Sequence, residues 1–224
     1  MLCSSTSKTK LCTSTWIGAN PGLRNKIAKA LIESGLITEA ILGDSKKTVE
    51  KLQAEVTMPS HEGSDTVRSD FVVNDSVVVE VKSCVCADYQ KDKAPAFDKK
   101  DRYVTVISED NEELYKKTAL FPIGKRAQNF QGQKVVSERC IKHLRHLAKI
   151  ARGEEKANGY ETACLLVIVN RGDCEKFRPC KEACPVFAQE FSNAVSDGVR
   201  IVAPKIVWSD NGDCQFGGLL PVEN

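Results

Sequence analysis

The sequence contains no segment that would carry it into a membrane. No apolar run approaches the roughly 18 residues that a membrane helix needs. With 42% hydrophobic and 28% charged residues, the composition is that of an ordinary soluble protein. Internal repeats and linker-like low-complexity stretches are also missing. These absences exclude a membrane span and predict a single α/β domain for the 224 residues.

An apolar signal segment is lacking at the start of the chain, although the chain has ten cysteines. Disulfide-rich domains are typically short and secreted, so we expect an intracellular, reducing compartment: the cytoplasm, with an organelle as the alternative. Residues 1–10 are rich in Ser, Thr and Lys, which predicts a disordered N-terminal tail. No C-x2-C knuckle is present, so the thiols are interpreted as isolated side chains and not as a zinc cluster.

Hydrophobic spacing predicts an α/β order of elements. The expected elements are a helix over 20–36, a hairpin of strands over 69–73 and 77–83, a helix over 136–151, a strand over 163–169, a helix over 185–197 and a strand over 199–203. The 163–169 strand is nearly all apolar, which is typical of a strand covered on both faces. Residues 88–133 are rich in charge and broken by Pro and Gly, so we expect a long surface insertion there.

Charged residues interrupt one of the Val-rich strands. Alternate side chains of a strand share a face, so Glu80 and Lys82 are expected to be neighbours. The position of Asp70 depends on the hairpin loop: a two-residue loop pairs it with Val79, and a three-residue loop places it opposite Glu80. No Gly follows Asn74, so the tight Asn-Gly turn is not indicated and we expect the three-residue loop.

Two carboxylates beside an ammonium group can hold a hard divalent cation in a phosphodiester-cleaving site. Charge on so apolar a strand is unusual unless it is paired or functional. The alternative is that Glu80 and Lys82 form a solvated ion pair, as in many sheets. The pattern alone does not decide between these interpretations.

Short motifs in a fixed order surround these residues. They are RSDF at 68–71, VEVKS at 79–83 and VSERCIKHLR at 136–145, with Asn20 and Asn25 ahead of them and AEV at 54–56. The first three resemble the R-x-D-F, E-V-K-S and V-T-E-R-G-x-K-H-L-R motifs of the sugar fermentation stimulation protein (SfsA) family. The two asparagines and the 54–56 segment resemble that family's paired asparagines and S-E-V. The resemblance runs from about Leu11 to the end of the sequence.

The resemblance implies a restriction-endonuclease-like (PD-(D/E)xK) α/β core over residues 11–224, with a mixed central sheet flanked by helices. Members of this family carry an OB-like nucleic-acid-binding domain ahead of that core, and we expect this domain to be absent from the chain. Two departures stand out. Ile123 replaces the acid of the family's F-P-D-A motif, and Cys140 replaces a glycine.

The resemblance also implies roles for individual residues. Asp70 and Glu80 would be the ligands of Mg²⁺ or Mn²⁺, with the Val81 carbonyl as a third. Lys82 would orient or activate the attacking water and balance charge in the transition state. Glu55 would be a further catalytic acid, and the alternative for it is an ordinary surface carboxylate.

Basic side chains recur along the 136–151 helix. Arg139, Lys142, His143 and His146 lie at i, i+3, i+4 and i+7 and form a basic stripe. For Arg139, Lys142 and His143 the resemblance favours phosphate contacts over the alternative of a solvated helix face. The net charge of +2 neither demands nor excludes a polyanionic partner. We therefore expect a nucleic-acid-binding protein, of DNA before RNA, with a metal-dependent nuclease site. The alternative is a non-catalytic DNA-binding regulator of sugar catabolism that keeps the nuclease fold.

Overall fold

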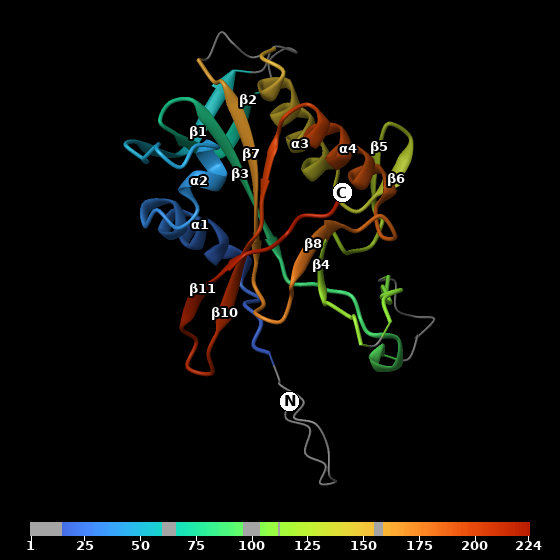
Figure 1. Cartoon of the computed structure of the whole chain (residues 1–224). Helices are drawn as coiled ribbons and strands as arrows, with labels where there is room; N and C mark the ends of the chain where they lie inside the picture. The colour runs from blue at the N-terminus through green and yellow to red at the C-terminus, as the bar shows by residue number, and fades with distance from the viewer. Residues whose placement is uncertain (1–14, 60–65, 96–103, 112, 155–158) are drawn as a thin grey trace.

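The computed structural model of the chain describes residues 15–59, 66–95, 104–111, 113–154 and 159–224. The predicted N-terminal tail, residues 1–10, lies outside the described residues. A seven-stranded sheet forms the centre of the molecule, and six of its strands follow one another in the order β1-β2-β3-β7-β10-β11, with β9 paired to β7 (Figure 1). The strands are β1 (Leu52–Pro59), β2 (Thr66–Val73), β3 (Val77–Cys84), β7 (Thr162–Val169), β9 (Arg200–Val202), β10 (Pro204–Trp208) and β11 (Cys214–Leu219).

The central sheet is mixed. The pairs β1–β2, β2–β3 and β10–β11 are antiparallel, whereas β7 runs parallel to β3, β9 and β10. The crossover from β7 to its parallel neighbour β9 passes through a helix, which is the usual connection between parallel strands. The expected mixed α/β architecture is confirmed.

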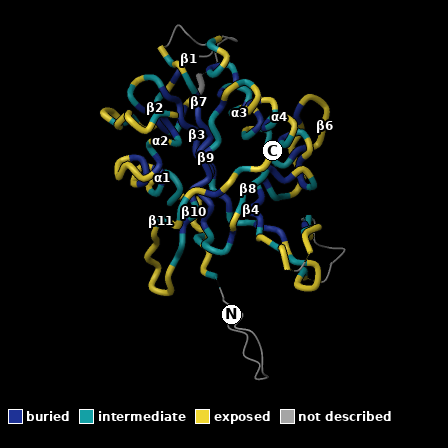
Figure 2. Tube along the Cα trace, viewed as in Figure 1, coloured by how far each residue is buried: buried dark blue, intermediate teal, exposed yellow. Residues whose placement is uncertain are grey.

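Helices cover both faces of the sheet. They are α1 (Arg24–Glu33) and α2 (Thr38–Leu42) on one face, and α3 (Glu138–Ala151) and α4 (Pro185–Ser196) on the other (Figure 1). Alternate residues of β3 and β7 enter the two cores because successive side chains of a strand point to opposite faces. Val79 and Val81 pack with α1 and α2, whereas Val78 packs with α3 and α4. The strands between these layers are buried along most of their length (Figure 2).

Most of the predicted elements are present, and the first helix differs in detail. The 20–36 segment divides into a 3-10 turn, η1 (Pro21–Leu23), and α1, which ends before Gly35. Gly35 has a φ of 78°, a conformation that glycine adopts without steric cost. In α3, Ser137 caps the N-terminus as expected, since its side chain accepts a hydrogen bond from the Cys140 amide.

The segment predicted as a surface insertion is only partly at the surface. It contains η2 (Lys91–Lys93), β4 (Thr118–Phe121) and β5 (Gln128–Phe130), and β6 (Gln133–Val135) follows. β4 pairs in parallel with β8 (Lys176–Pro179), and its first three residues are buried. Part of this segment therefore belongs to the core. Within the described residues no helix is long and apolar enough to cross a membrane.

Candidate active site

The hairpin of β2 and β3 has the three-residue loop that the sequence predicted. Val73 pairs with Val77, so residues 74–76 form the loop. Asn74 and Asp75 have positive φ values of 51° and 54°, which Asn and Asp tolerate better than other non-glycine residues. The Asn74 side chain also accepts hydrogen bonds from the backbone amides of residues 50 and 51, at 2.8 and 3.0 Å. These contacts attach the loop to the start of β1 and determine the register.

Asp70 lies where β2 separates from β3. Pairing between the two strands ends at Phe71 and Val79, and continuing that register by one residue places Asp70 opposite Glu80. Asp70 Oδ2 instead accepts a hydrogen bond of 2.7 Å from the Val81 amide. The N–H and C=O of one strand residue point to the same neighbouring strand, so the Val81 carbonyl also faces the Asp70 side.

A second donor holds the other oxygen of Asp70. Asn25 Nδ2, from the start of α1, donates to Asp70 Oδ1 at 2.9 Å, while Asn25 Oδ1 accepts from Arg24 Nε at 3.3 Å. Both Asp70 oxygens therefore have a donor, and each retains a lone pair for another ligand. The sequence drew attention to Asn20 and Asn25 as a pair without indicating this contact. Asn20 has a different role, because its side chain caps η1.

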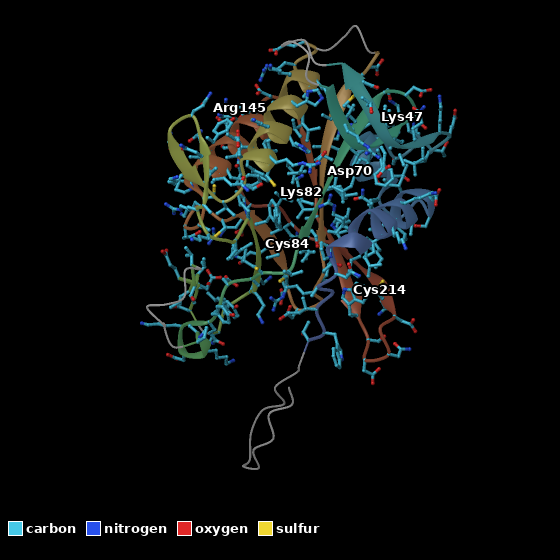
Figure 3. All side chains as sticks on the ribbon, turned by 180° about the vertical axis from the view of Figure 1, so that it is seen from behind. Lys47, Asp70, Lys82, Cys84, Arg145 and Cys214 are labelled. Carbon is cyan, nitrogen blue, oxygen red and sulfur yellow. The ribbon has the colours of Figure 1, made fainter. Side chains whose placement is uncertain are left out.

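Glu80 and Lys82 form a buried ion pair on the face covered by α3. Their residues are 5% and 7% exposed, and Lys82 Nζ lies 2.5 Å from Glu80 Oε1. Burial by itself raises the pKa of Glu80, but the His143 hydrogen bond and the Lys82 charge outweigh it, so this pKa is lowered from 4.5. The alternative of a solvated ion pair does not describe these two side chains. Figure 3 labels Asp70 and Lys82, which come from neighbouring strands near the middle of the molecule.

His143 reaches the site from the opposite layer. Its Nδ1 forms a short hydrogen bond with Glu80 Oε1, and its Nε2 accepts from Arg139 Nε at 3.3 Å. The sequence grouped Arg139, Lys142, His143 and His146 as a basic stripe, and predicted phosphate contacts for the first three. In the structure, Lys142 is exposed and lies 2.8 Å from Glu138, one turn back along α3, whereas His143 turns inward. The contact between His143 and Glu80 was not foreseen.

Glu55 lies level with Asp70 but points elsewhere. The register of β1 with β2 is the same on either side of it, since Ala54 pairs with Phe71 and Val56 with Ser69. Glu55 itself has a φ of 56°, an outlying conformation for a strand residue, and its exposed carboxylate pairs with Arg68. The structure therefore brings Glu80, Lys82 and His143 together, and it ties Asp70 to the amide of Val81, between Glu80 and Lys82 on β3. The Glu55 carboxylate is engaged by a surface arginine.

The oxygens of this site suit a hard cation. Carboxylate and carbonyl oxygens are the ligands that Mg²⁺ prefers, and Asp70, Glu80 and the Val81 carbonyl are the groups here that would supply them. In the part of the chain that the structure describes, no group of three or more His, Cys, Asp or Glu side chains is arranged to hold a metal ion. A cation here would accordingly use two carboxylates, a main-chain oxygen and water. Ile123, in place of the family's acid, packs against an apolar cluster with Val106 and Leu120.

Comparison with known proteins agrees with this fold. The model of the sugar fermentation stimulation protein RE domain matches residues 134–212. A solved structure described as Pyrococcus furiosus SfsA in complex with Ca²⁺ superposes with a TM-score of 0.56 and 21% sequence identity, over 91% of this chain and 65% of that one. The central mixed sheet and its flanking helices thus define a restriction-endonuclease-like domain.

Curated protein sequences show a similarity of the same kind. A sugar fermentation stimulation protein homolog of Cyanothece sp. is 28% identical over 207 residues, which are 91% of this chain and 64% of that protein. A homolog from Sinorhizobium medicae is 41% identical over 69 residues, 31% of this chain and 26% of that protein. The chain is thus similar to sugar fermentation stimulation proteins over most of its length, and residues 134–212 match the RE-domain model of that family. It spans less than two thirds of the length of its relatives from Cyanothece and Thermosynechococcus, 64% and 65% respectively.

Proposed function

We propose that this protein is a nuclease that hydrolyses phosphodiester bonds with the help of a divalent metal ion. The observation that carries the proposal is the buried ion pair of Glu80 and Lys82, with Asp70 bound to the amide of Val81 between them, where β2 and β3 separate. Two of these charged groups are almost completely buried in a Val-rich strand. Burying charge is costly, and such charge is concentrated at functional sites.

In this proposal Asp70, Glu80 and the Val81 carbonyl hold Mg²⁺ or Mn²⁺. Bound there, the cation would polarise the phosphate and lower the pKa of a water molecule. The Ca²⁺ named for the Pyrococcus furiosus protein supports the binding of a divalent ion. Lys82 orients the attacking water and stabilises the negative charge of the pentavalent phosphorus. Glu55 acts as a further acid through water, if it leaves its surface pair with Arg68.

The proposed substrate is DNA in preference to RNA. Arg139 and Lys142 are exposed on α3, the helix that delivers His143 to the site, and we propose that they contact backbone phosphates. Such contacts hold a strand through its charge and carry no sequence information. Affinity is therefore expected to be modest and to depend strongly on salt.

The second candidate function is DNA binding without turnover, as in a regulator of sugar catabolism. It is favoured by Ile123, which stands where the family's F-P-D-A motif has an acid. The apolar side chain of Ile123 packs with Val106 and Leu120. Binding alone, however, does not need two carboxylates facing a polyanion, because they would repel it. The retention of Asp70 and Glu80 beside Lys82 therefore favours the enzyme.

A cleavage screen separates the two functions. The purified protein is incubated with single-stranded, duplex and branched DNA and with RNA, each with Mg²⁺, with Mn²⁺ or with a chelator. The enzyme proposal expects cleavage of at least one substrate that requires a metal and is abolished in Asp70→Asn. If the wild type binds these nucleic acids and cleaves none of them under any metal, the regulatory function replaces the nuclease.

A further inference from the structure

The imidazole of His143, a member of the α3 basic stripe, turns into the site and contacts Glu80. We infer that His143 is a positioning residue that holds the Glu80 carboxylate, and that Arg139 keeps its ring in the required tautomer. The inference rests on the proposed metal-dependent function. It assigns His143 a task different from contacting phosphate.

Both ring nitrogens of His143 have a partner. Nε2 accepts a hydrogen bond from Arg139 Nε at 3.3 Å, and a nitrogen that accepts cannot carry the proton. The proton of the neutral ring therefore resides on Nδ1, which donates it to Glu80 Oε1. The side chain is only 14% exposed, so little of the ring is available to a phosphate.

The two donors to Glu80 converge on one oxygen. Lys82 Nζ, from the same strand, and His143 Nδ1, from α3, both donate to Oε1. Two donors from different elements restrain rotation of the carboxyl group more than one donor would. This arrangement leaves Oε2 as the oxygen of Glu80 that is free of both donors and available to a cation.

The helix that carries His143 is firmly anchored. Ile141, Leu144 and Leu147 are each at most 2% exposed and belong to the core shared with β7. A side chain placed by such a packed helix has little freedom to move, which is the property that a support for a metal ligand needs. Loss of an outer partner of a metal ligand typically lowers metal affinity about 10- to 100-fold.

A calorimetric titration with Mn²⁺ tests the inference. His143→Ala is expected to weaken Mn²⁺ binding by about 10- to 100-fold. His143→Asn retains an N–H close to the place of Nδ1 and is expected to recover most of that loss, which also guards against a folding defect in the alanine variant. The matched control is Lys142→Ala, one residue earlier on the exposed face, which should leave Mn²⁺ binding unchanged.

Duplex DNA binding in the presence of a chelator is measured on the same variants. His143→Ala should bind DNA as the wild type does, whereas Lys142→Ala should bind more weakly because one phosphate contact is lost. If His143→Ala binds Mn²⁺ normally, or loses as much DNA affinity as Lys142→Ala, the positioning role is refuted.

The metal-free protein provides a separate test. The sequence has only three histidines, so His143→Asn assigns the His143 signals in a long-range proton–nitrogen NMR spectrum. The inference expects the neutral ring to carry its proton on Nδ1 and none on Nε2, and the opposite tautomer would overturn it. If the wild type binds no Mn²⁺, the proposed metal site fails, and the tautomer still decides whether His143 supports Glu80.

Discussion

Removal of the Lys82 ammonium group is predicted to destabilise the protein, because the buried Glu80 carboxylate loses its charged partner. Lys82→Met keeps the length of the side chain and deletes the charge that neutralises Glu80. Breaking a buried ion pair by removing one partner costs about 3–5 kcal/mol. The bond from His143 to Glu80 remains and offsets about 1.5–3 kcal/mol, the worth of a hydrogen bond to a charged group. With the midpoints of these two ranges, we expect a net loss of about 2 kcal/mol in the free energy of unfolding.

The loss should depend on pH in a defined direction. In the wild type the pKa of Glu80 is lowered, so its contribution to stability is present above its ordinary value of 4.5 and is lost as the pH falls below that value. Without the Lys82 charge, only His143 still opposes the effect of burial, so the pKa of Glu80 is expected to rise. Acidification from pH 7.5 to 5 then partly neutralises Glu80 in the variant alone, and the stability difference between the two proteins narrows.

Urea unfolding at these two pH values measures the effect, with Glu80→Gln/Lys82→Met as the matched control. The double variant buries no charge at either position and should recover at least half of the loss. An exposed ion pair is worth only about 0–1 kcal/mol. A cost for Lys82→Met below about 1 kcal/mol at both pH values would show that the pair is solvated, and the argument from buried charge would fail.

Three further outcomes are expected. Asn25→Ala removes one of the two donors to Asp70 and should weaken Mn²⁺ binding about 10-fold in a calorimetric titration; unchanged binding would mean that Asp70 needs no such support. Burial raises the pKa of Asp173, but Arg171 and Lys117 outweigh it and hold this pKa at about 2, below the usual 3.8. Asp173→Asn should therefore cost about 2 kcal/mol at pH 7 in urea unfolding, and the difference from the wild type should disappear as the pH falls from about 4 to 2. The DNA-binding constant should fall steeply between about 50 and 200 mM salt, because its logarithm decreases with the logarithm of the salt concentration in proportion to the number of phosphate contacts. Salt-insensitive binding would contradict the proposed interface.

The register of the β2–β3 hairpin was predictable from local chemistry. The absence of Gly after Asn74 argued against the tight turn, and the three-residue loop then determined which side chain lies opposite Glu80. The apolar 163–169 segment likewise indicated a central strand, since β7 is buried on both faces. Such features depend on neighbours in the sequence, so a single sequence reveals them.

The supports of the two carboxylates were not predictable in this way. Asn25 is 45 residues from Asp70, and His143 is 63 residues from Glu80, and each pair meets because separate helices pack on the sheet. The periodicity of α3 identified its apolar and basic residues, but not the inward rotation of one member of the basic stripe. The positive φ of Glu55 within β1 has no signal in residue type either, because Glu is not enriched in that conformation.

The 88–133 segment contains a buried strand that the sequence did not predict. Its charge and its Pro and Gly residues predicted surface structure, yet the buried β4 lies within it because this strand pairs with β8. The pairing joins residues almost 60 positions apart, and a four-residue strand is too short for a periodic pattern to stand out.

The central claim is that Asp70, Glu80 and Lys82 together form a site that cleaves phosphodiester bonds. Its most direct test is the Mn²⁺-dependent cleavage rate of an end-labelled oligonucleotide by the wild type and by Lys82→Ala, with the Mn²⁺ affinity of both proteins measured on the same samples. The account predicts that Lys82→Ala still binds Mn²⁺ but cleaves at least about 100-fold more slowly, because the lost group stabilises the transition state and is not a ligand. Equal cleavage rates at equal Mn²⁺ occupancy, or no metal-dependent cleavage by the wild type, would contradict it.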